Sequence, residues 1–251
     1  MKILLPVKMH DFSEKMSHFE AFLDHNGYLN IYREIEAAAP GKVYILGGVI
    51  RDFFILGKNS KINDLDLVID DVTDPFTEEK LVASLSSIGK LTKNRYNSYK
   101  LVISGGKQVD ITPFTKSKYS ADHQEFPSLA TRLKTSFFNL ESVALDMQTK
   151  KLYEIGFFKD LNNKTLSVLN EQYGQYHTHY VRAVLYEKKF KLEGFKIDKS
   201  VLDFLRKRYL IHSDDPALQP TEKLIKEYLE SKGKRDQTEY LFARLKELGV
   251  I

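Results

Sequence analysis

The strongest constraint on the fold is a stretch in which two apolar runs flank a glycine pair and a short helical pattern. The run Val43–Leu46 leads directly into Gly47 and Gly48, residues 49–56 have the apolar spacing of a short helix, and a second run covers residues 65–69. Apolar runs of this length predict buried strands, and glycine marks the turn between strand and helix. A chain built in this way is expected to form a mixed α/β structure rather than a helical bundle.

The rest of the chain alternates between helical and extended patterns up to about residue 155 and is helical after about residue 178. In the first forty residues, apolar side chains recur every three to four positions, which predicts helices. The segments expected in the middle of the chain are a helix near residues 78–88, a hairpin of strands 99–103 and 108–114 around the glycine pair at 105–106, and strands 141–147 and 151–155.

This order predicts an α+β chain of three parts. We expect a helical extension over residues 1–40, a mixed-sheet head over residues 41–168 and an all-helical domain over residues 169–251. A chain of 251 residues is long enough for one large domain or two modest ones, so the division fits its length.

Composition excludes several classes of protein. The chain has no cysteine, which rules out disulfides, thiolate zinc sites and a cysteine nucleophile, and fits a reducing compartment. No window approaches the roughly 18 to 20 apolar residues that span a bilayer, and the opening residues are too soon broken for a signal peptide. We therefore expect a cytoplasmic protein without a membrane partner.

The charge balance indicates the partner only weakly. Residues 1–150 carry 19 Lys and Arg against 19 Asp and Glu, and residues 151–251 carry the remaining 19 against 15, so the whole net charge of +4 lies in the C-terminal part. A surplus of this size fits a solvated helical surface as well as a phosphate-bearing partner.

The glycine pair lies where a phosphate group could approach the backbone. Glycine has no side chain to block an anion, and the first N–H groups of the following helix have no intrahelical partner. Arg51, one turn into that helix, could reach the same anion, and Asp52 follows it. A glycine pair alone is usually no more than a turn.

Two carboxylates on the next strand complete the pattern. Asp64 and Asp66 are two residues apart, so both side chains project from one face of the strand. Adjacent carboxylates repel each other unless a divalent cation lies between them, although an isolated pair more often is solvated or caps a helix. Glycines that bind phosphate beside oxygen ligands for magnesium are what phosphoryl or nucleotidyl transfer requires.

Three consecutive segments together resemble a known enzyme family. Gly47-Gly-Val-Ile-Arg-Asp52, Phe53-Phe-Ile-Leu-Gly57 and Asp64-Leu-Asp66-Leu-Val are similar to the signature of the class II poly(A) polymerase and CCA-adding tRNA nucleotidyltransferase head domain. That family is a branch of the DNA polymerase β-like nucleotidyltransferase superfamily. The likeness continues through Phe138–Asp146 and Ile155–Lys164 and extends over roughly residues 42–192. It implies a polymerase β-like mixed-sheet head followed by a helical neck.

The resemblance also implies a site and its cofactors. Asp110 would complete a carboxylate triad with Asp64 and Asp66, and the triad would hold two Mg²⁺ ions. The residues implied to bind the nucleotide are Gly47, Gly48, Arg51, Asp52, Lys134, Asn139, Tyr176, His179 and Arg182. The implied reaction transfers a nucleoside monophosphate, AMP from ATP in the first instance, to a hydroxyl such as an RNA 3′ end and releases pyrophosphate.

The chain departs from the family pattern where the base of the nucleotide is read. The family's Arg-Arg-Asp is Leu133-Lys-Thr135 here, and Thr115 stands where an Arg is expected. In the neck motif, Gln175 replaces the acid, Tyr176 the Asp and His179 the first Arg, while Arg182 keeps the second. Two interpretations follow: a transferase that reads another base or stacks it on a tyrosine, or a degenerate module that binds nucleotide or RNA without catalysis.

The acceptor stays open at this stage. Family members continue past the neck into helical domains that hold tRNA, whereas about sixty residues follow Leu192 here. Full recognition of the tRNA elbow, and CCA addition to tRNA, are therefore not expected. The acceptor could be a shorter RNA, a small molecule with a hydroxyl group or a protein side chain.

Overall fold

The helices and strands of the chain fall into two compact units. The structure is a computed structural model that describes residues 6–58, 60–71, 78–93, 98–116, 127–171, 177–211, 226–227, 229–230 and 235–249. Unit 1 comprises residues 1–135 and 140–157, and unit 2 comprises residues 136–139 and 158–251. Among the described residues, no helix is both long enough and apolar enough to cross a membrane.

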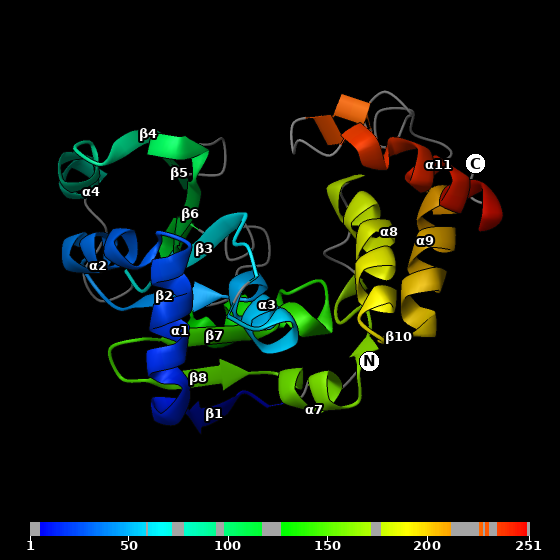
Figure 1. Cartoon of the computed structure of the whole chain (residues 1–251), viewed down its shortest axis with the longest axis horizontal. Coiled ribbons are helices and arrows are strands. Elements are labelled where there is room, and N and C mark those ends of the chain that lie inside the picture. The colour runs from blue at the N-terminus through cyan, green and yellow to red at the C-terminus, as the bar shows by residue number, and fades with distance from the viewer. Residues whose placement is uncertain are drawn as a thin grey trace. The chain divides into compact units, whose positions relative to one another are not determined.

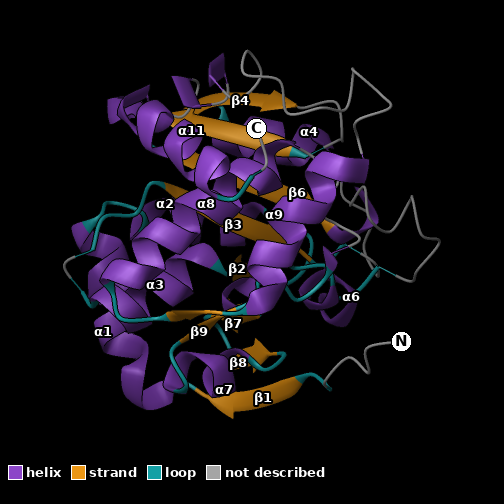
Figure 2. Cartoon of the chain, turned by 90° about the vertical axis from the view of Figure 1, so that its right-hand side faces the viewer, coloured by secondary structure: helices purple, strands orange, loops and turns teal. Residues whose placement is uncertain are grey.

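Unit 1 is built on one eight-stranded sheet (Figures 1 and 2). Its strands are β1 (Lys8–Asp11), β2 (Val43–Leu46), β3 (Asp64–Ile69), β4 (Gly89–Lys93), β5 (Tyr99–Ile103), β6 (Gln108–Pro113), β7 (Val143–Asp146) and β8 (Lys151–Glu154). Their order is β1-β8-β7-β2-β3-β6-β5-β4, with β4 at the top of Figure 2 and β1 at the bottom. The neighbours β3 and β6 are parallel, and the other neighbouring pairs are antiparallel. The mixed sheet predicted from the sequence is confirmed.

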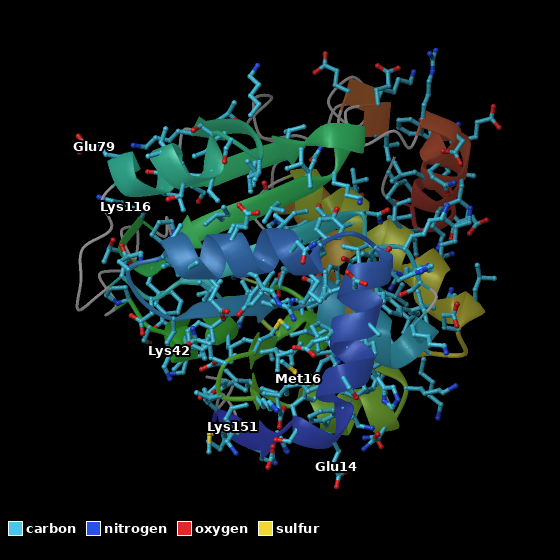
Figure 3. The ribbon with its side chains drawn as sticks, turned by 60° about the vertical axis from the view of Figure 1, so that its left-hand side comes forward. Glu14, Met16, Lys42, Glu79, Lys116 and Lys151 are labelled. Atoms are coloured by element: carbon cyan, nitrogen blue, oxygen red, sulfur yellow. The ribbon has the colours of Figure 1, made fainter. Side chains whose placement is uncertain are left out.

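Aromatic side chains connect two of the helices of unit 1. These helices are α1 (Ser13–His25), α2 (Leu29–Ala38), α3 (Gly48–Leu56), α4 (Glu78–Leu85) and α6 (Leu129–Lys134). On α1, Met16 and Phe19 are buried, whereas Glu14 points into solvent (Figure 3). The rings of Phe19 and of Phe53 on α3 meet edge to face with centroids 5.2 Å apart. The helices predicted for the first forty residues are confirmed, and they belong to unit 1.

Strand alternation gives the centre of the sheet one apolar and one polar face. Leu65 and Leu67 of β3 are fully buried, whereas Asp64 and Asp66 beside them are half-buried. The neighbouring strand β6 repeats the same alternation of buried and half-buried residues. The apolar side chains join the core, so the carboxylates project from the opposite face.

Several elements were not predicted from the sequence. The edge strands β1 and β4 are mostly exposed and lack apolar alternation. The helices α6 and α7 (Phe157–Asn162) have six residues each, which is too short for a helical period to be read with confidence from apolar spacing.

Unit 2 is mainly helical in its described part. It contains α8 (His177–Leu192), α9 (Lys199–Ile211) and α11 (Thr238–Glu247), with a parallel pair of short strands, β9 (Thr165–Leu166) and β10 (Lys196–Ile197). The ring of Phe137 lies 4.6 Å from that of Phe138 and 4.7 Å from that of Phe204, measured between centroids. The predicted helices after residue 178 are confirmed in the described residues, and β10 interrupts them.

Candidate active site

Strand register brings the glycine pair and the two aspartates to one end of the sheet. The antiparallel pairing of β2 with β3 places Ile45 opposite Leu67. The C-terminal end of β2, which runs into Gly47, therefore lies at the end of the sheet where β3 begins with Asp64. The glycine pair and the two aspartates, which are separated in the sequence, thus lie at the same end of the sheet.

The three predicted carboxylates project from one face of neighbouring strands. β3 and β6 pair Asp66 with Asp110, and β6 and β5 pair Asp110 with Lys100. Asp64 lies two residues before Asp66 and opposite Gln108. Directly paired residues point to the same face of a sheet. We call Asp64, Asp66 and Asp110 the acidic row; the strand register places all three on one face of the sheet, and their role as a carboxylate triad stays a prediction.

The two glycines differ in what surrounds them. Gly47 has a φ of +28°, and a Cβ added to it would lie 2.9 Å from the carbonyl oxygen of Glu141. Both the backbone conformation and the close approach therefore require glycine at this position. A Cβ added to Gly48 would meet nothing nearer than the Arg51 guanidinium at 3.8 Å. Gly48, at the start of α3, thus leaves room for an anion beside the helix N-terminus and Arg51.

Arg51 is held in place by two carboxylates. Its Nε donates to Asp52 at 2.8 Å, and its Nη1 donates to Glu141 at 3.3 Å. Arg51 is only 4% exposed, so its orientation is fixed by these contacts and by packing. Asp52 has two expected roles, to orient Arg51 or to orient a metal-bound water; its hydrogen bond with Arg51 agrees with the first. Glu141 was missed, because residues so far apart in the sequence give no pairing signal.

The helices at the N-terminus of the chain support the acidic row. The Asn26 side chain, between α1 and α2, donates to the Ser60 carbonyl at 3.1 Å and accepts from the Ile62 N–H at 3.1 Å. These bonds hold the backbone that leads into β3. Tyr28 lies nearby: burial, and to a lesser extent the Asp64 charge, raise its phenol pKa, against a backbone hydrogen bond from Gln108.

The nucleotide-binding candidates after residue 130 are divided between the two units. Lys134 is half-buried in the last turn of α6 in unit 1. Asn139, in unit 2, is 1% exposed, and its amide donates to Asp160 and Thr165 and accepts from the Ser167 N–H. These bonds give Asn139 a structural role, and its part in a nucleotide pocket stays a prediction.

Two candidates on α8 are packed among aromatic rings of unit 2. The His179 ring lies 4.9 Å from that of Phe137. Arg182 donates to the Tyr186 hydroxyl at 3.2 Å, and its guanidinium carbon lies 5.3 Å from the Tyr186 ring centroid. Tyr176, the third candidate of this group, lies outside the described residues.

Two departures from the family pattern have structural explanations. Thr115 donates its hydroxyl hydrogen to the fully buried Asp71, which also accepts the Thr115 N–H at 2.9 Å. This contact joins the ends of β3 and β6. Leu133 is buried in a small apolar cluster with Tyr44 and Phe114. Thr115 therefore serves a hydrogen bond to Asp71 and Leu133 serves packing in this chain.

The donor set of the acidic row fits a hard divalent cation. Mg²⁺ in proteins takes one or two carboxylates and completes its shell with water and substrate phosphates. Asp66 and Asp110 supply two adjacent half-buried carboxylates, and the glycine turn lies at the same end of the sheet. Within the described ranges, no three His, Cys, Asp or Glu side chains converge on one point, and Asp110 instead contacts Lys100.

Comparison with known proteins identifies solved structures of similar fold. No protein-family model and no curated protein matches the chain. A CCA-adding enzyme in an apo form superposes with a TM-score of 0.65 at 21% identity, over 96% of this chain and 55% of the other. The Thermotoga maritima CCA-adding enzyme complexed with tRNA-CCA gives 0.62 at 21%, over the same shares. A tRNA-processing enzyme in an apo form gives 0.56 at 18%, over 100% of this chain and 59% of the other.

These comparisons concern the fold. The chain spans only 53% to 59% of the length of these CCA-adding and tRNA-processing enzyme structures. At such low identity, the likeness extends to the path of the chain and the order of its elements. The predicted α+β class is confirmed: the chain has the nucleotidyltransferase fold of the CCA-adding enzyme structures.

Proposed function

We propose that the chain is a nucleotidyltransferase that moves a nucleoside monophosphate from a nucleoside triphosphate to a hydroxyl group of an acceptor, an RNA 3′ end in the first instance. The observation that carries the proposal is the acidic row at the same end of the sheet as the glycine turn and Arg51. Similar structures are of CCA-adding enzymes with CTP, with ATP and with tRNA, which supports a nucleotide substrate and an RNA acceptor.

The residues of the glycine turn bind the triphosphate. The N-terminus of α3 offers backbone N–H groups, and Gly48 leaves them accessible. Asp52 and Glu141 fix the orientation of the Arg51 side chain. Its guanidinium group is therefore already placed for contact with a bound phosphate and loses little rotamer freedom on binding. Because the glycine turn and the acidic row lie at the same end of the sheet, a triphosphate bound at the turn would lie near the row.

The acidic row would hold the metal ions. Asp64 and Asp66 on β3, completed by Asp110 on β6, are the carboxylates available on this face. Bound Mg²⁺ would lower the charge of the phosphates and favour the ionised form of the attacking hydroxyl. The acceptor hydroxyl loses its proton to solvent and its oxygen forms a bond to the α-phosphorus; the bond from that phosphorus to the bridging oxygen breaks, and pyrophosphate leaves with the electron pair.

The nucleotide and the acceptor are narrower proposals. We propose ATP as the preferred donor, with Lys134, Asn139, Tyr176, His179 and Arg182 as candidates for contact with the nucleotide. Because Arg182 is already engaged with aromatic rings, base selection in this chain would depend on stacking more than on a hydrogen-bonding fork.

The test is the variant Asp64→Ala in a transfer assay. The protein is incubated with each labelled triphosphate and Mg²⁺, with total RNA, with small hydroxyl compounds or without acceptor. We expect transfer by the wild-type protein and a loss of at least about a thousandfold in Asp64→Ala. The melting temperature should stay unchanged or rise, because one of several repelling carboxylates is removed.

A matched control tests whether the loss of transfer is specific to the acidic row or follows from the removal of any carboxylate. Asp24 is an exposed carboxylate on α1 of the same unit, and Asp24→Ala should transfer at the wild-type rate. Wild-type rates in Asp64→Ala would contradict the proposal.

Two observations favour a second function, a module that binds nucleotide without transferring it. The acidic row does not converge on one point, and Asp110 contacts a lysine. Such a module would bind a non-hydrolysable ATP analogue with the same affinity in the presence and absence of Mg²⁺. Calorimetry that shows at least about fivefold tighter binding with Mg²⁺ would exclude it.

A further inference from the structure

Lys100 lies directly beside the acidic row, on a strand that carries none of its carboxylates. It is the cross-strand partner of Asp110, which in turn is the partner of Asp66. The three residues therefore form one line across β3, β6 and β5, on one face of the sheet. Two members of this line are carboxylates and the third is a cation.

The ammonium group of Lys100 is held by two acceptors. Its Nζ lies 3.5 Å from Oδ1 of Asp110 and 3.2 Å from Oε1 of Gln108. About a third of each charged side chain, 35% for Lys100 and 34% for Asp110, is exposed. Both acceptors come from β6, so the lysine side chain crosses from β5 to a defined place on the neighbouring strand.

This contact has two opposite effects on a bound divalent cation. The ammonium keeps the Asp110 carboxylate in one orientation, which favours a site assembled for reaction. The same positive charge repels a metal ion at the row and competes with it for a carboxylate oxygen. The Lys100 side chain therefore favours one orientation of Asp110 and at the same time weakens the binding of a divalent cation.

We propose that Lys100 is a positioning residue of the acidic row, which orients Asp110 and competes with the divalent cation for its carboxylate. The inference rests on the proposed function, because that function gives the row its metal. It assigns Lys100 no proton transfer and no contact with the reacting atoms.

The test measures metal binding and turnover separately. Mn²⁺ takes the same oxygen ligands as Mg²⁺ and is followed by its electron paramagnetic resonance signal in the absence of nucleotide. We expect Lys100→Met to bind Mn²⁺ about two- to fivefold more tightly than the wild-type protein, which is the effect expected of an ion pair whose side chains are about one-third exposed. Its kcat should fall by about tenfold, because Asp110 loses its orientation.

Two further variants make the result specific. Lys100→Arg keeps the charge and should restore most of both properties. Lys90, on β4, is an exposed lysine opposite Val102 of β5, one strand farther from Asp110. Lys90→Met removes an equal charge from this side of the sheet and should leave Mn²⁺ affinity and kcat at wild-type values.

The outcomes distinguish this inference from the proposed function. Tighter Mn²⁺ binding with slower turnover supports it, because damage to the fold would weaken both. Equal or weaker Mn²⁺ binding by Lys100→Met, with an active wild-type protein, overturns the role of Lys100 alone. Tighter binding by Lys100→Met in a protein that transfers no nucleotide supports the competition and overturns the transferase. A wild-type protein that binds no Mn²⁺ overturns both.

Discussion

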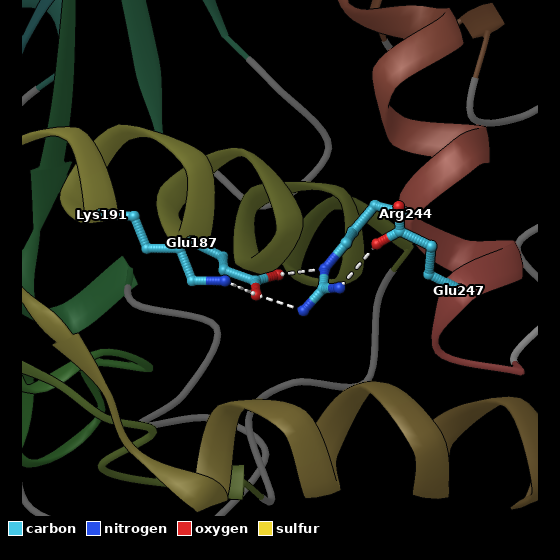
Figure 4. A network of polar contacts seen from close by, with 4 residues as sticks. All are labelled: Glu187, Lys191, Arg244 and Glu247. Atoms are coloured by element: carbon cyan, nitrogen blue, oxygen red, sulfur yellow. Dashed lines mark hydrogen bonds and ion pairs between the residues drawn. The ribbon is translucent and has the colours of Figure 1, made fainter.

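Two clusters of charge, one in each unit, are satisfied in different ways. In unit 2, Glu187 of α8 is fully buried and accepts hydrogen bonds from Arg244 of α11 at 2.6 and 3.0 Å and from Lys191 at 2.7 Å (Figure 4). Arg244 also contacts Glu247 at 2.8 Å. We call these four residues the Glu187 network. In unit 1, the acidic row gathers three carboxylates on a half-buried face beside one lysine.

The difference separates charges that hold a fold from charges available to a ligand. In the Glu187 network, two cations meet two carboxylates, and the central carboxylate is closed to water. Burial acts to raise the pKa of Glu187, but the hydrogen bonds from Arg244 and Lys191 outweigh burial and the pKa lies below its ordinary value. The acidic row keeps an excess of negative charge on an accessible face, which costs stability and is typical of a binding site.

Arg244→Ala should have the largest effect on stability. The substitution leaves a buried carboxylate with Lys191 as its remaining partner in the network, which costs about 3 kcal/mol of unfolding free energy. Denaturant unfolding of the two proteins measures the loss. Mn²⁺ binding by the acidic row should not change, because the two clusters lie in different units.

An apolar replacement of the pair provides the control. The double variant Glu187→Leu with Arg244→Leu removes both charges and should regain most of the lost stability, since no buried charge is left without a partner. If Arg244→Ala lowered the unfolding free energy by less than about 1 kcal/mol, the Glu187 network would contribute no more than an ordinary surface ion pair. The network would then not differ from the acidic row in its contribution to stability.

The glycine pair allows the same distinction inside unit 1. Gly47→Ala should cost about 2 kcal/mol, because alanine is strained at positive φ and its Cβ would lie 2.9 Å from the Glu141 oxygen. Gly48→Ala should fold with wild-type stability within about 0.5 kcal/mol and bind a triphosphate at least about fivefold more weakly, because its methyl group stands beside Arg51. Denaturant unfolding and calorimetry measure the two effects.

The outcome for Gly48 decides whether the turn binds an anion. Unchanged triphosphate affinity in Gly48→Ala would make the glycine pair a turn with no further role. A loss of stability equal to that of Gly47→Ala would show that both glycines serve the fold.

The sequence was most informative where periodicity and spacing coincide. The alternation around Asp64 and Asp66 predicted their common face, and the hairpin around Gly105 and Gly106 was found as expected. A hairpin turn also fixes register, so the pairing of Lys100 with Asp110 could have been read from the same turn. That pairing was not predicted, because a lysine on a strand is usually solvated and gives no sign of a partner on the next strand.

Contacts between distant segments could not be read from the sequence. Glu141 is 90 residues from Arg51, and Arg244 is 57 residues from Glu187. Neither pair leaves a local signal, because a charged residue on a helix is usually solvated. Such pairs emerge only when packing brings two elements together and excludes water from the group between them.

The smallest expected effect is a difference between the charge clusters in acid. Since the pKa of Glu187 is lowered in the folded protein, the folded chain binds its proton more weakly than the unfolded chain. The stabilisation is complete above the ordinary glutamate pKa of about 4.3 and is lost as the pH falls through the lower pKa of the folded state. Protonation removes the negative charge of Glu187 that its hydrogen-bond donors stabilise, and this weakens the network. Glu187→Gln should therefore be less stable than the wild-type protein at pH 7, and chemical denaturation should show that the difference narrows below pH 4. A constant difference across this range would mean that Glu187 contributes through packing rather than charge, and the two clusters would then differ in burial alone.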